Sequence, residues 1–305
     1  MTDLAPAPSR TRFAWLANQP YLLLTLTSLF WSGNAIAGRF AAGHIPPVTL
    51  AFIRWGGAFL ITLPFAWSHL VRDWPAIREK LGLMIAISVI GIGMFNTMQY
   101  WALEYTQALN VLLLQSAGPL FVAIWSLMLL GVRLTWAQAA GIVVSMCGVL
   151  VILLHGDLTA LTSIGFNRGD VIFTIALMIF GFYSVMTLKK PAIHGLSFLA
   201  FTFAGGALCL VPLVIWELFT QPLMQLTAPN MLALFYVVVF PSTLAYLFYN
   251  RGVQLIGANR AAPFLHLVPV FGAVMAIFLL GEKLQLFHII GFVLVIVGVV
   301  VAARK

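Results

Sequence analysis

Ten apolar runs of about 20 residues follow one another along the chain, with only short connectors between them. A helix needs roughly 20 mostly apolar residues to cross the hydrocarbon core of a bilayer. Strands of an outer-membrane barrel would instead alternate apolar and polar residues, and these runs do not alternate. We therefore expect ten transmembrane helices, at residues 21–40, 48–67, 81–103, 108–130, 136–154, 170–188, 196–218, 230–250, 258–280 and 286–302.

Composition supports an all-α membrane protein, because 62% of the 305 residues are hydrophobic and only 8% are charged. Soluble domains carry about 25% charged residues, so this chain could not cover a water-facing surface. Residues 1–19 are expected to form a cytoplasmic amino-terminal tail. Arg10 and Arg12 before the first run imitate a cleaved secretory signal, but Trp31 and Asn34 inside that run fit a retained first span.

Basic residues predict the orientation of the chain. With ten spans both termini lie on one side, and that side collects eleven bases against three on the other. Positive-inside bias then places both termini in the cytoplasm of a bacterial inner membrane. The eleven are Arg10, Arg12, Arg72, Arg78, Lys80, Arg133, Lys189, Lys190, Arg251, Arg304 and Lys305, and the three are Arg39, Arg168 and Lys283. Such bases contact anionic lipid headgroups, so no nucleic acid partner is expected.

The second half of the chain repeats landmarks of the first half at a shift of 150 residues. The aligned pairs are Pro119 and Pro269, Gly131 and Gly281, Gly141 and Gly291, and Gly148 and Gly298. Each half holds five predicted spans, and because five is odd the halves enter the membrane from opposite sides. Residues 20–154 and 170–303 are therefore predicted to be two inverted five-helix repeats of a single transport unit. Secondary transporters of this build hold the substrate near the midplane, where the repeats meet.

Four stretches of the sequence resemble the EamA-type members of the drug/metabolite transporter (DMT) superfamily. They are LFWSGNAIAGRF in the first span, LAFIRWGGAF in the second, and GVRLTWAQAAGIVVSMCGVLVIL and GEKLQLFHIIGFVLVIVGVVV, which close the two halves. The Gly-Glu-Lys of residues 281–283 is a frequent mark of the family, and residues 131–133 read Gly-Val-Arg instead. More specifically, nearly the whole chain resembles the YddG-type aromatic amino acid exporters of bacterial inner membranes. A fold that carries many cargoes does not by itself fix the cargo.

Polar and aromatic side chains recur at helical spacing within several predicted spans, and we expect them to line a central cavity. Residues three or four apart share one face of a helix. Amides and hydroxyls inside a bilayer either line such a cavity or hold neighbouring helices together. The candidate lining residues are Trp31, Asn34, Asn96, Gln99, Tyr100, Trp101, Gln115, Tyr183, Ser242, Tyr246 and His266.

Arg54 lies seven residues into the second predicted span, where a charge is expensive. We expect a structural or gating charge that either snorkels outward or pairs with Glu104 at the end of the third span. Pro119 and Pro269 occupy matched positions in the two repeats. Proline lacks an N–H and kinks a helix, so this pair either forms a two-sided gate or bends the helices for packing.

His266 is expected to be the only deep titratable side chain, because every carboxylate falls at a span end or in a connector. It is either a hydrogen-bonding wall of the cavity or a proton carrier. Proton-driven pumps commonly rely on an acid inside a span. The sequence therefore favours facilitated transport that follows the cargo gradient over obligate proton exchange.

The expected function is export of aromatic and other neutral amino acids by alternating access. Aromatic rings offer stacking surfaces to such cargo, and amides orient its polar head. Multidrug or metabolite efflux, with or without proton coupling, is the alternative. The expected partners are a small-molecule substrate and the lipid bilayer, and the protein is expected to be a monomer.

Catalysis is not expected, because the sequence has no His-Glu-x-x-His motif and residues 195–199 lack the second glycine of a nucleophile elbow. A channel is disfavoured because no carbonyl-filter motif or charged ring is present. Cys147 and Cys209 show no metal-ligand spacing. Neither a metal nor a cofactor is therefore expected.

Overall fold

The computed structural model describes residues 18–131, 135–156, 167–257 and 261–302, and within them every regular element is a helix. Most of the predicted tail at residues 1–19, together with Arg133, Arg304 and Lys305, lies outside these residues. The elements are α1 Pro20–Ala41, α2 Pro47–Glu79, α3 Leu81–Ile87, η2 Ser88–Met94, α4 Phe95–Leu103, α5 Ala108–Gln115, α6 Gly118–Leu130, α7 Trp136–Leu153, α9 Arg168–Thr187, α10 Gly195–Thr220, α11 Ala228–Val237, η3 Val238–Leu244, α12 Ala245–Ile256, η4 Ala262–His266, α14 Leu267–Leu280 and α15 Leu286–Ala302.

Several of these helices are long and apolar enough to cross a membrane. By length and composition five stretches qualify, namely Pro47–Glu79, Leu81–Leu103, Arg168–Thr187, Gly195–Thr220 and Ala228–Ile256. A sixth is the bent pair of α5 and α6, whose axes differ by 44°. The all-α prediction is thus confirmed for the described residues. The count of ten spans and their inversion remain predictions.

The two halves of the structure repeat each other in register. The π-helices η2 and η3 cover Ser88–Met94 and Val238–Leu244, a shift of 150 residues at both ends. The helices α6 and α14 both end at a glycine in the left-handed region, Gly131 with φ 62° and Gly281 with φ 67°. Glycine tolerates this conformation because it has no Cβ. The landmarks found in the sequence therefore mark equivalent structural positions.

The wide turn of η3 surrounds a proline. Pro241 lacks an N–H, and the hydroxyl groups of Ser242 and Thr243 donate to the carbonyls five residues earlier, at 2.7 and 2.9 Å. In η2 the corresponding region is rich in glycine: a Cβ on Gly91 would stand 2.0 Å from the Tyr183 ring. π-helical turns frequently occur at functional sites in helices.

The matched prolines stand in the first turns of helices, and Pro119 adjoins the 44° bend between α5 and α6. Pro119 stands in the first turn of α6, directly after the break that separates α5 from α6. Pro269 stands in the first turn of α14, directly after the short 3₁₀-helix η4. A proline there loses no hydrogen bond, because the first N–H groups of a helix have no partner within it.

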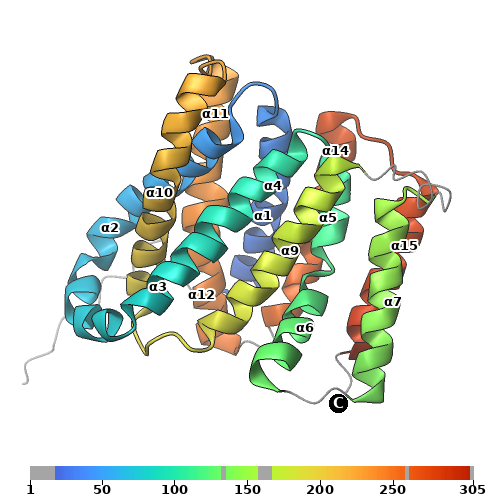
Figure 1. Cartoon of the computed structure of the whole chain (residues 1–305), viewed down its shortest axis with the longest axis horizontal. Coiled ribbons are helices and arrows are strands. Elements are labelled where there is room, and N and C mark those ends of the chain that lie inside the picture. Colours follow the sequence, from blue (N-terminus) through green and yellow to red (C-terminus); the bar gives the residue numbers. More distant parts are fainter. Residues whose placement is uncertain (1–17, 132–134, 157–166, 258–260, 303–305) are drawn as a thin grey trace, which may run out of the picture.

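Figure 1 shows how the helices are arranged. The helices α2 and α10 pack along each other at one side, and α7 and α15 form a pair at the opposite edge. The connectors 42–46, 104–107, 221–227 and 281–285 lie at the end drawn uppermost, which we call the upper end. Under the predicted orientation the upper end is the non-cytoplasmic one.

Glycines allow α7 and α15 to touch backbone to backbone. A Cβ on Gly148 would stand 2.6 Å from the carbonyl oxygen of Gly291, and a Cβ on Gly298 would stand 2.4 Å from the amide nitrogen of Ser145. Small residues at helix interfaces in membranes permit this close approach. Cys147 of α7 is exposed, and Cys209 of α10 is half-buried as a free thiol.

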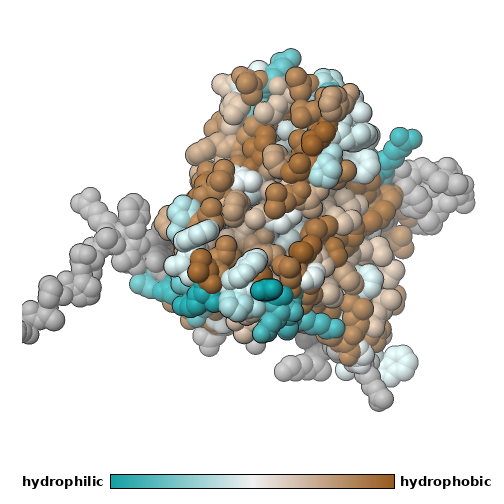
Figure 2. Space-filling view, turned by 60° about the vertical axis from the view of Figure 1, so that its left-hand side comes forward, coloured by the Kyte–Doolittle hydropathy of each residue, from teal (hydrophilic) through white to brown (hydrophobic). Residues whose placement is uncertain are grey.

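The exterior of the molecule is largely apolar. Large hydrophobic side chains such as Trp136, Phe219 and Phe278 are more than 80% exposed. Figure 2 shows hydrophobic side chains over most of one face, with hydrophilic ones gathered in a lower band and at the top. This surface fits a chain whose surroundings are lipid.

Candidate functional site

Arg54 is 2% exposed and forms the centre of a polar shell built by α1, α2, α4 and η3. Its Nε donates to Ser242 Oγ at 2.6 Å. Its Nη1 donates to Asn34 Oδ1 at 2.8 Å, Asn96 Oδ1 at 2.9 Å and the Tyr100 hydroxyl at 2.8 Å. These four partners are neutral, and no carboxylate lies within ion-pair distance of the guanidinium in the described part of the chain. We call Arg54 and these four residues the Arg54 shell.

Further contacts fix the orientation of the shell. Tyr100 donates its hydroxyl to Asn34 Oδ1 at 2.7 Å, and the Asn34 amide donates to Gln99 Oε1 at 3.5 Å. The Ser242 hydroxyl donates its hydrogen bond to the Val237 carbonyl, so its oxygen lone pairs are left to accept from Arg54. The π-helix η3 thus supplies a hydroxyl acceptor at the depth of the arginine.

Two donors in this region have no hydrogen-bond partner among the described residues. All four hydrogen bonds of Arg54 leave from Nε and Nη1, which leaves its Nη2 group unpartnered. The indole Nε1 of Trp55 is also buried without a partner. The guanidinium carbon lies 4.3 Å from the centre of the Trp55 ring, within cation–π distance. The Trp55 indole is thus a buried donor without a partner, which is rare in proteins and calls for an explanation.

Aromatic rings pack against one another beside the Arg54 shell. The Trp55 ring lies 5.0 Å from Phe203 and 6.3 Å from Tyr246. Trp31 meets Tyr246 at 5.6 Å and Tyr249 at 5.4 Å, and its Nε1 donates to the Pro241 carbonyl at 3.0 Å. The site therefore joins one cation and several amides to a set of aromatic faces.

The structure brings together most of the lining residues that the sequence suggested. Asn34, Asn96, Tyr100 and Ser242 belong to the Arg54 shell, and Gln99 bonds Asn34. Trp31 and Tyr246 belong to the aromatic rings beside it. Tyr183 packs on Gly91 of η2, and Gln115 is half-buried at the end of α5. Trp101 is 48% exposed and faces a pocket at the upper end instead. That pocket has a volume of about 810 Å³ between α4, α10 and the nearby connectors.

Arg54 neither snorkels outward nor pairs with Glu104. Glu104 accepts the backbone N–H of Gly43 at 3.2 and 3.1 Å, so it holds the α1–α2 connector. Partial burial raises the pKa of the Glu104 carboxyl, and the hydrogen bond from Gly43 opposes that shift. The arginine is instead buried among neutral hydrogen-bond partners, which neither sequence alternative predicted.

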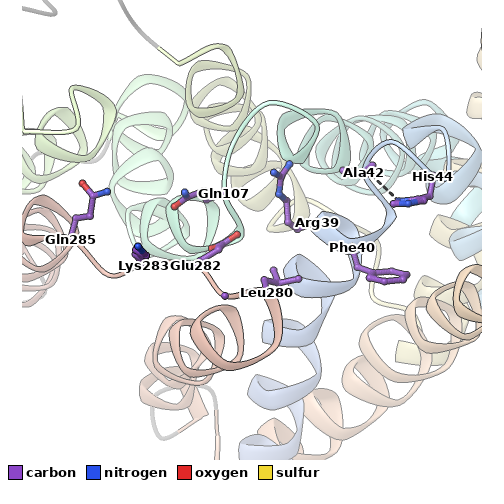
Figure 3. Close-up of a pocket in the computed structure, with 10 residues that line it drawn as sticks. Arg39, Phe40, Ala42, His44, Gln107, Leu280, Glu282, Lys283 and Gln285 are labelled. Atoms are coloured by element: carbon purple, nitrogen blue, oxygen red, sulfur yellow. Dashed lines mark hydrogen bonds between the residues drawn. The ribbon is translucent and has the colours of Figure 1, made fainter.

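The upper-end acids bind backbone amides. Glu217 is 3% exposed and accepts the N–H groups of Val48 and Thr49, at 3.1 and 2.7 Å, in the first turn of α2. Glu282 accepts two N–H groups in the first turn of α5 at 2.8 Å each. A carboxylate is stabilised there by unpaired N–H groups and the helix dipole. Figure 3 shows Glu282 with Gln107 and Arg39 around a second pocket of about 550 Å³.

The position of His266 deep in its span stays a prediction, but the helices enclose two titratable groups that the sequence did not single out. His266 is exposed at the end of η4, whereas Asp170 and His288 are 0% and 1% exposed. Both stand in the first turn of their helix, a place that the sequence alone cannot distinguish from an exposed helix end. Trp55 and Phe203 were also missed, because nothing in an apolar run separates a ring at a site from a ring in the core.

A model of the EamA-like transporter family matches residues 18–154 and again residues 167–304. A solved crystal structure, 20% identical, covers 94% of this chain and 98% of its own with a TM-score of 0.60, which shows a shared fold.

Relatives over nearly the full length are transporters by name. The uncharacterized transporter YyaM of Bacillus subtilis is 28% identical over 93% of both chains. An uncharacterized transporter of Archaeoglobus fulgidus is 29% identical over 94% of this chain and 98% of its own. A probable terminal-alkyne amino-acid exporter of Streptantibioticus cattleyicolor is 26% identical over 92% of both chains. Because the family model matches both halves, this chain belongs to the EamA-like transporter family, a group of multi-pass membrane transporters.

Proposed function

We propose that this transporter exports neutral amino acids, aromatic ones among them, across a bacterial inner membrane by alternating access. One observation carries the proposal: a buried arginine without a carboxylate partner lies among amides and aromatic rings. Both termini are placed in the cytoplasm. The resemblance to YddG-type exporters and the name of the Streptantibioticus cattleyicolor relative are in keeping with this cargo class.

A buried cation is costly unless an anion offsets it, because its hydration is lost. Arg54 has neutral partners in the described structure, so a cargo carboxylate would supply the missing charge. The Nη2 group, which takes part in none of these four hydrogen bonds, and the Trp55 indole N–H would supply donors for such an anion. Guanidinium and carboxylate form charge-assisted hydrogen bonds, which are roughly twice as strong as neutral ones. The rings of Trp31, Phe203 and Tyr246 would then receive an apolar side chain.

The Arg54 shell contains no carboxylate and no imidazole among the described residues, and arginine stays charged at all working pH values. The cargo site therefore has no group to exchange a proton during each cycle. We accordingly keep facilitated, gradient-following exchange as the energetic mode. The competing function is multidrug efflux, which the apolar pocket beside Trp101 and Trp216 favours.

The cargo class is tested by counterflow in proteoliposomes that hold the purified full chain. Labelled L-phenylalanine should exchange saturably between equal pools, and L-leucine should compete with it. Phenethylamine, the same molecule without its carboxylate, should compete at least ~100-fold more weakly. Two charge-assisted hydrogen bonds at roughly 1.5 kcal/mol or more each account for that factor.

A lipophilic cation, tetraphenylphosphonium, serves as the probe for multidrug efflux in the same vesicles. It should neither exchange nor inhibit. Inhibition by tetraphenylphosphonium or phenethylamine as strong as that by L-leucine would establish the multidrug alternative and overturn the amino acid proposal.

The predicted orientation is tested by cysteine labelling in intact cells, in a background with Cys147→Ser and Cys209→Ser. Lys305→Cys should resist a membrane-impermeant thiol reagent, because positive-inside bias places the carboxyl terminus in the cytoplasm. Gln221→Cys, in an exposed connector at the upper end, is the matched control and should react. The reverse pattern would invert every assignment of inside and outside.

A further inference from the structure

A second buried polar cluster lies at the upper end, apart from the Arg54 shell. It consists of Thr106, Asn110, His155, Asp170 and His288, which come from α5, α9, α15, the α4–α5 connector and the turn after α7. Neither the proposed cargo site nor its mechanism uses these residues. Asp170 is 0% exposed and has three donor partners.

The hydrogen bonds define the charge of this cluster. Asp170 accepts from the Thr106 hydroxyl, from Asn110 Nδ2 at 3.1 and 3.0 Å, and from His155 Nε2 at 3.2 Å. His288 Nδ1 accepts the Gln285 backbone N–H at 3.0 Å, so its proton sits on Nε2 and is donated to Asn110 Oδ1 at 2.7 Å. His288 is therefore neutral, and every contact of Asp170 suits an ionised carboxylate.

His155 connects the buried carboxylate with the surroundings. Its side chain is 43% exposed, whereas that of Asp170 is fully buried. Its backbone is left-handed, with φ 51°, two residues past Leu153 at the end of α7, a position where glycine or asparagine is usual. Gly169 permits the approach of α9, because a Cβ there would stand 2.5 Å from the Ala102 carbonyl. The accessible His155 imidazole is thus hydrogen-bonded to the inaccessible Asp170 carboxylate.

The cluster attaches a peripheral helix pair to the rest of the molecule. The helices α7 and α15 pack on each other and meet the remaining helices mainly through α5 and α6. At the upper end His155 binds α9 from the end of α7, and His288 binds α5 from α15. Both attachments converge on Asn110 and Asp170, so the state of this acid bears on both helices.

We propose that Asp170 and His155 form a proton-binding site, and that a proton bound there docks the α7–α15 pair on α5 and α9. The added proton binds His155 Nδ1, while His155 Nε2–H keeps its hydrogen bond to the Asp170 carboxylate. The resulting imidazolium offsets the buried carboxylate. Without that proton Asp170 keeps a buried charge with only neutral donors, a state that favours separation and hydration.

The direction in which pH changes the docking of the α7–α15 pair follows from where the proton is bound. Because the docked state carries the extra proton, mass action favours docking at low pH and undocking as the pH rises. A one-proton site changes the ratio of docked to undocked protein by up to about tenfold per pH unit. A proton bound at this site controls the docking of the α7–α15 pair and does not enter the cargo site. The other ionisable groups at these helix ends are Glu104, Tyr105, Arg168, Glu282 and Lys283.

The test measures the distance between spin labels at Ile175→Cys in α9 and Ile290→Cys in α15, both at exposed positions. The full chain is held in lipid nanodiscs, with Cys147 and Cys209 replaced by serine and no cargo added. Between pH 5 and 8 the docked fraction should fall several-fold. His155→Asn should abolish the dependence on pH, because asparagine suits the left-handed position and cannot gain a proton. Asp170→Asn should abolish it as well.

His44→Gln is the matched control, since His44 is an exposed histidine at the same end of the molecule. It should keep the response. A parent without a response, a response retained by His155→Asn, or a response lost in His44→Gln would each overturn the proposal. If Asp170→Asn does not fold, His155→Asn decides the result alone. Because no cargo is present, failure here is separate from failure of the proposed amino acid function.

Discussion

Arg54→Met should reduce L-phenylalanine counterflow by about 100-fold or more while leaving the protein folded. Methionine has a similar length and no charge, so the cargo carboxylate would lose roughly 3 kcal/mol of charge-assisted hydrogen bonding. Stability should fall by about 1–3 kcal/mol, because the acceptors of the Arg54 shell lose their donor, and removal of the buried charge offsets part of that cost. Thermal unfolding and counterflow of the same preparation provide both measurements.

Arg54→Lys is the companion variant. It retains the charge but loses the planar fork that binds a carboxylate through two parallel hydrogen bonds. Its counterflow should fall between that of the parent and that of Arg54→Met. A purely structural arginine would behave differently: the properly folded fraction of Arg54→Met would transport at the parental rate. That outcome would remove Arg54 from the cargo site.

Gly298→Ala should destabilise the protein by about 1–3 kcal/mol, the usual cost of overpacking a tight contact. The added Cβ would stand 2.4 Å from the backbone nitrogen of Ser145 and 2.5 Å from the Gly141 carbonyl. Backbone atoms cannot rotate away as a side chain can, so α7 and α15 must separate. Thermal unfolding in detergent micelles measures the loss.

Gly56→Ala is the control for this substitution, because no atom lies within 4 Å of a Cβ placed on Gly56 in α2. Alanine is favoured over glycine inside a helix by up to about 1 kcal/mol, so this variant should be slightly more stable. The two changes are chemically identical and opposite in sign. Equal effects would mean that the α7–α15 contact does not depend on the absence of a Cβ.

Side-chain chemistry made part of the site predictable. Trp31 and Asn34 share a helix face, as do Asn96, Gln99 and Tyr100, and in the structure these residues lie at or beside the Arg54 shell. Polar side chains within an apolar run can be recognised as candidate site residues, because lipid offers them no hydrogen-bond partner. Local spacing does not give the depth of a residue between helices. For that reason the sequence did not predict that Asp170 and His288 are buried.

The sequence by itself determined that this chain is helical and membrane-bound, because its apolar runs have the length and composition that a bilayer requires. It also determined the repeat, since matched glycines and prolines recur at a shift of 150 and mark equivalent helix ends in the structure. Only the tertiary structure decided which charges are buried and what they meet. Arg54 meets groups from α1, α4 and η3, and Asp170 meets groups from α5 and α7. Such contacts join residues up to 188 positions apart, and no local pattern encodes them because helix packing alone sets those distances.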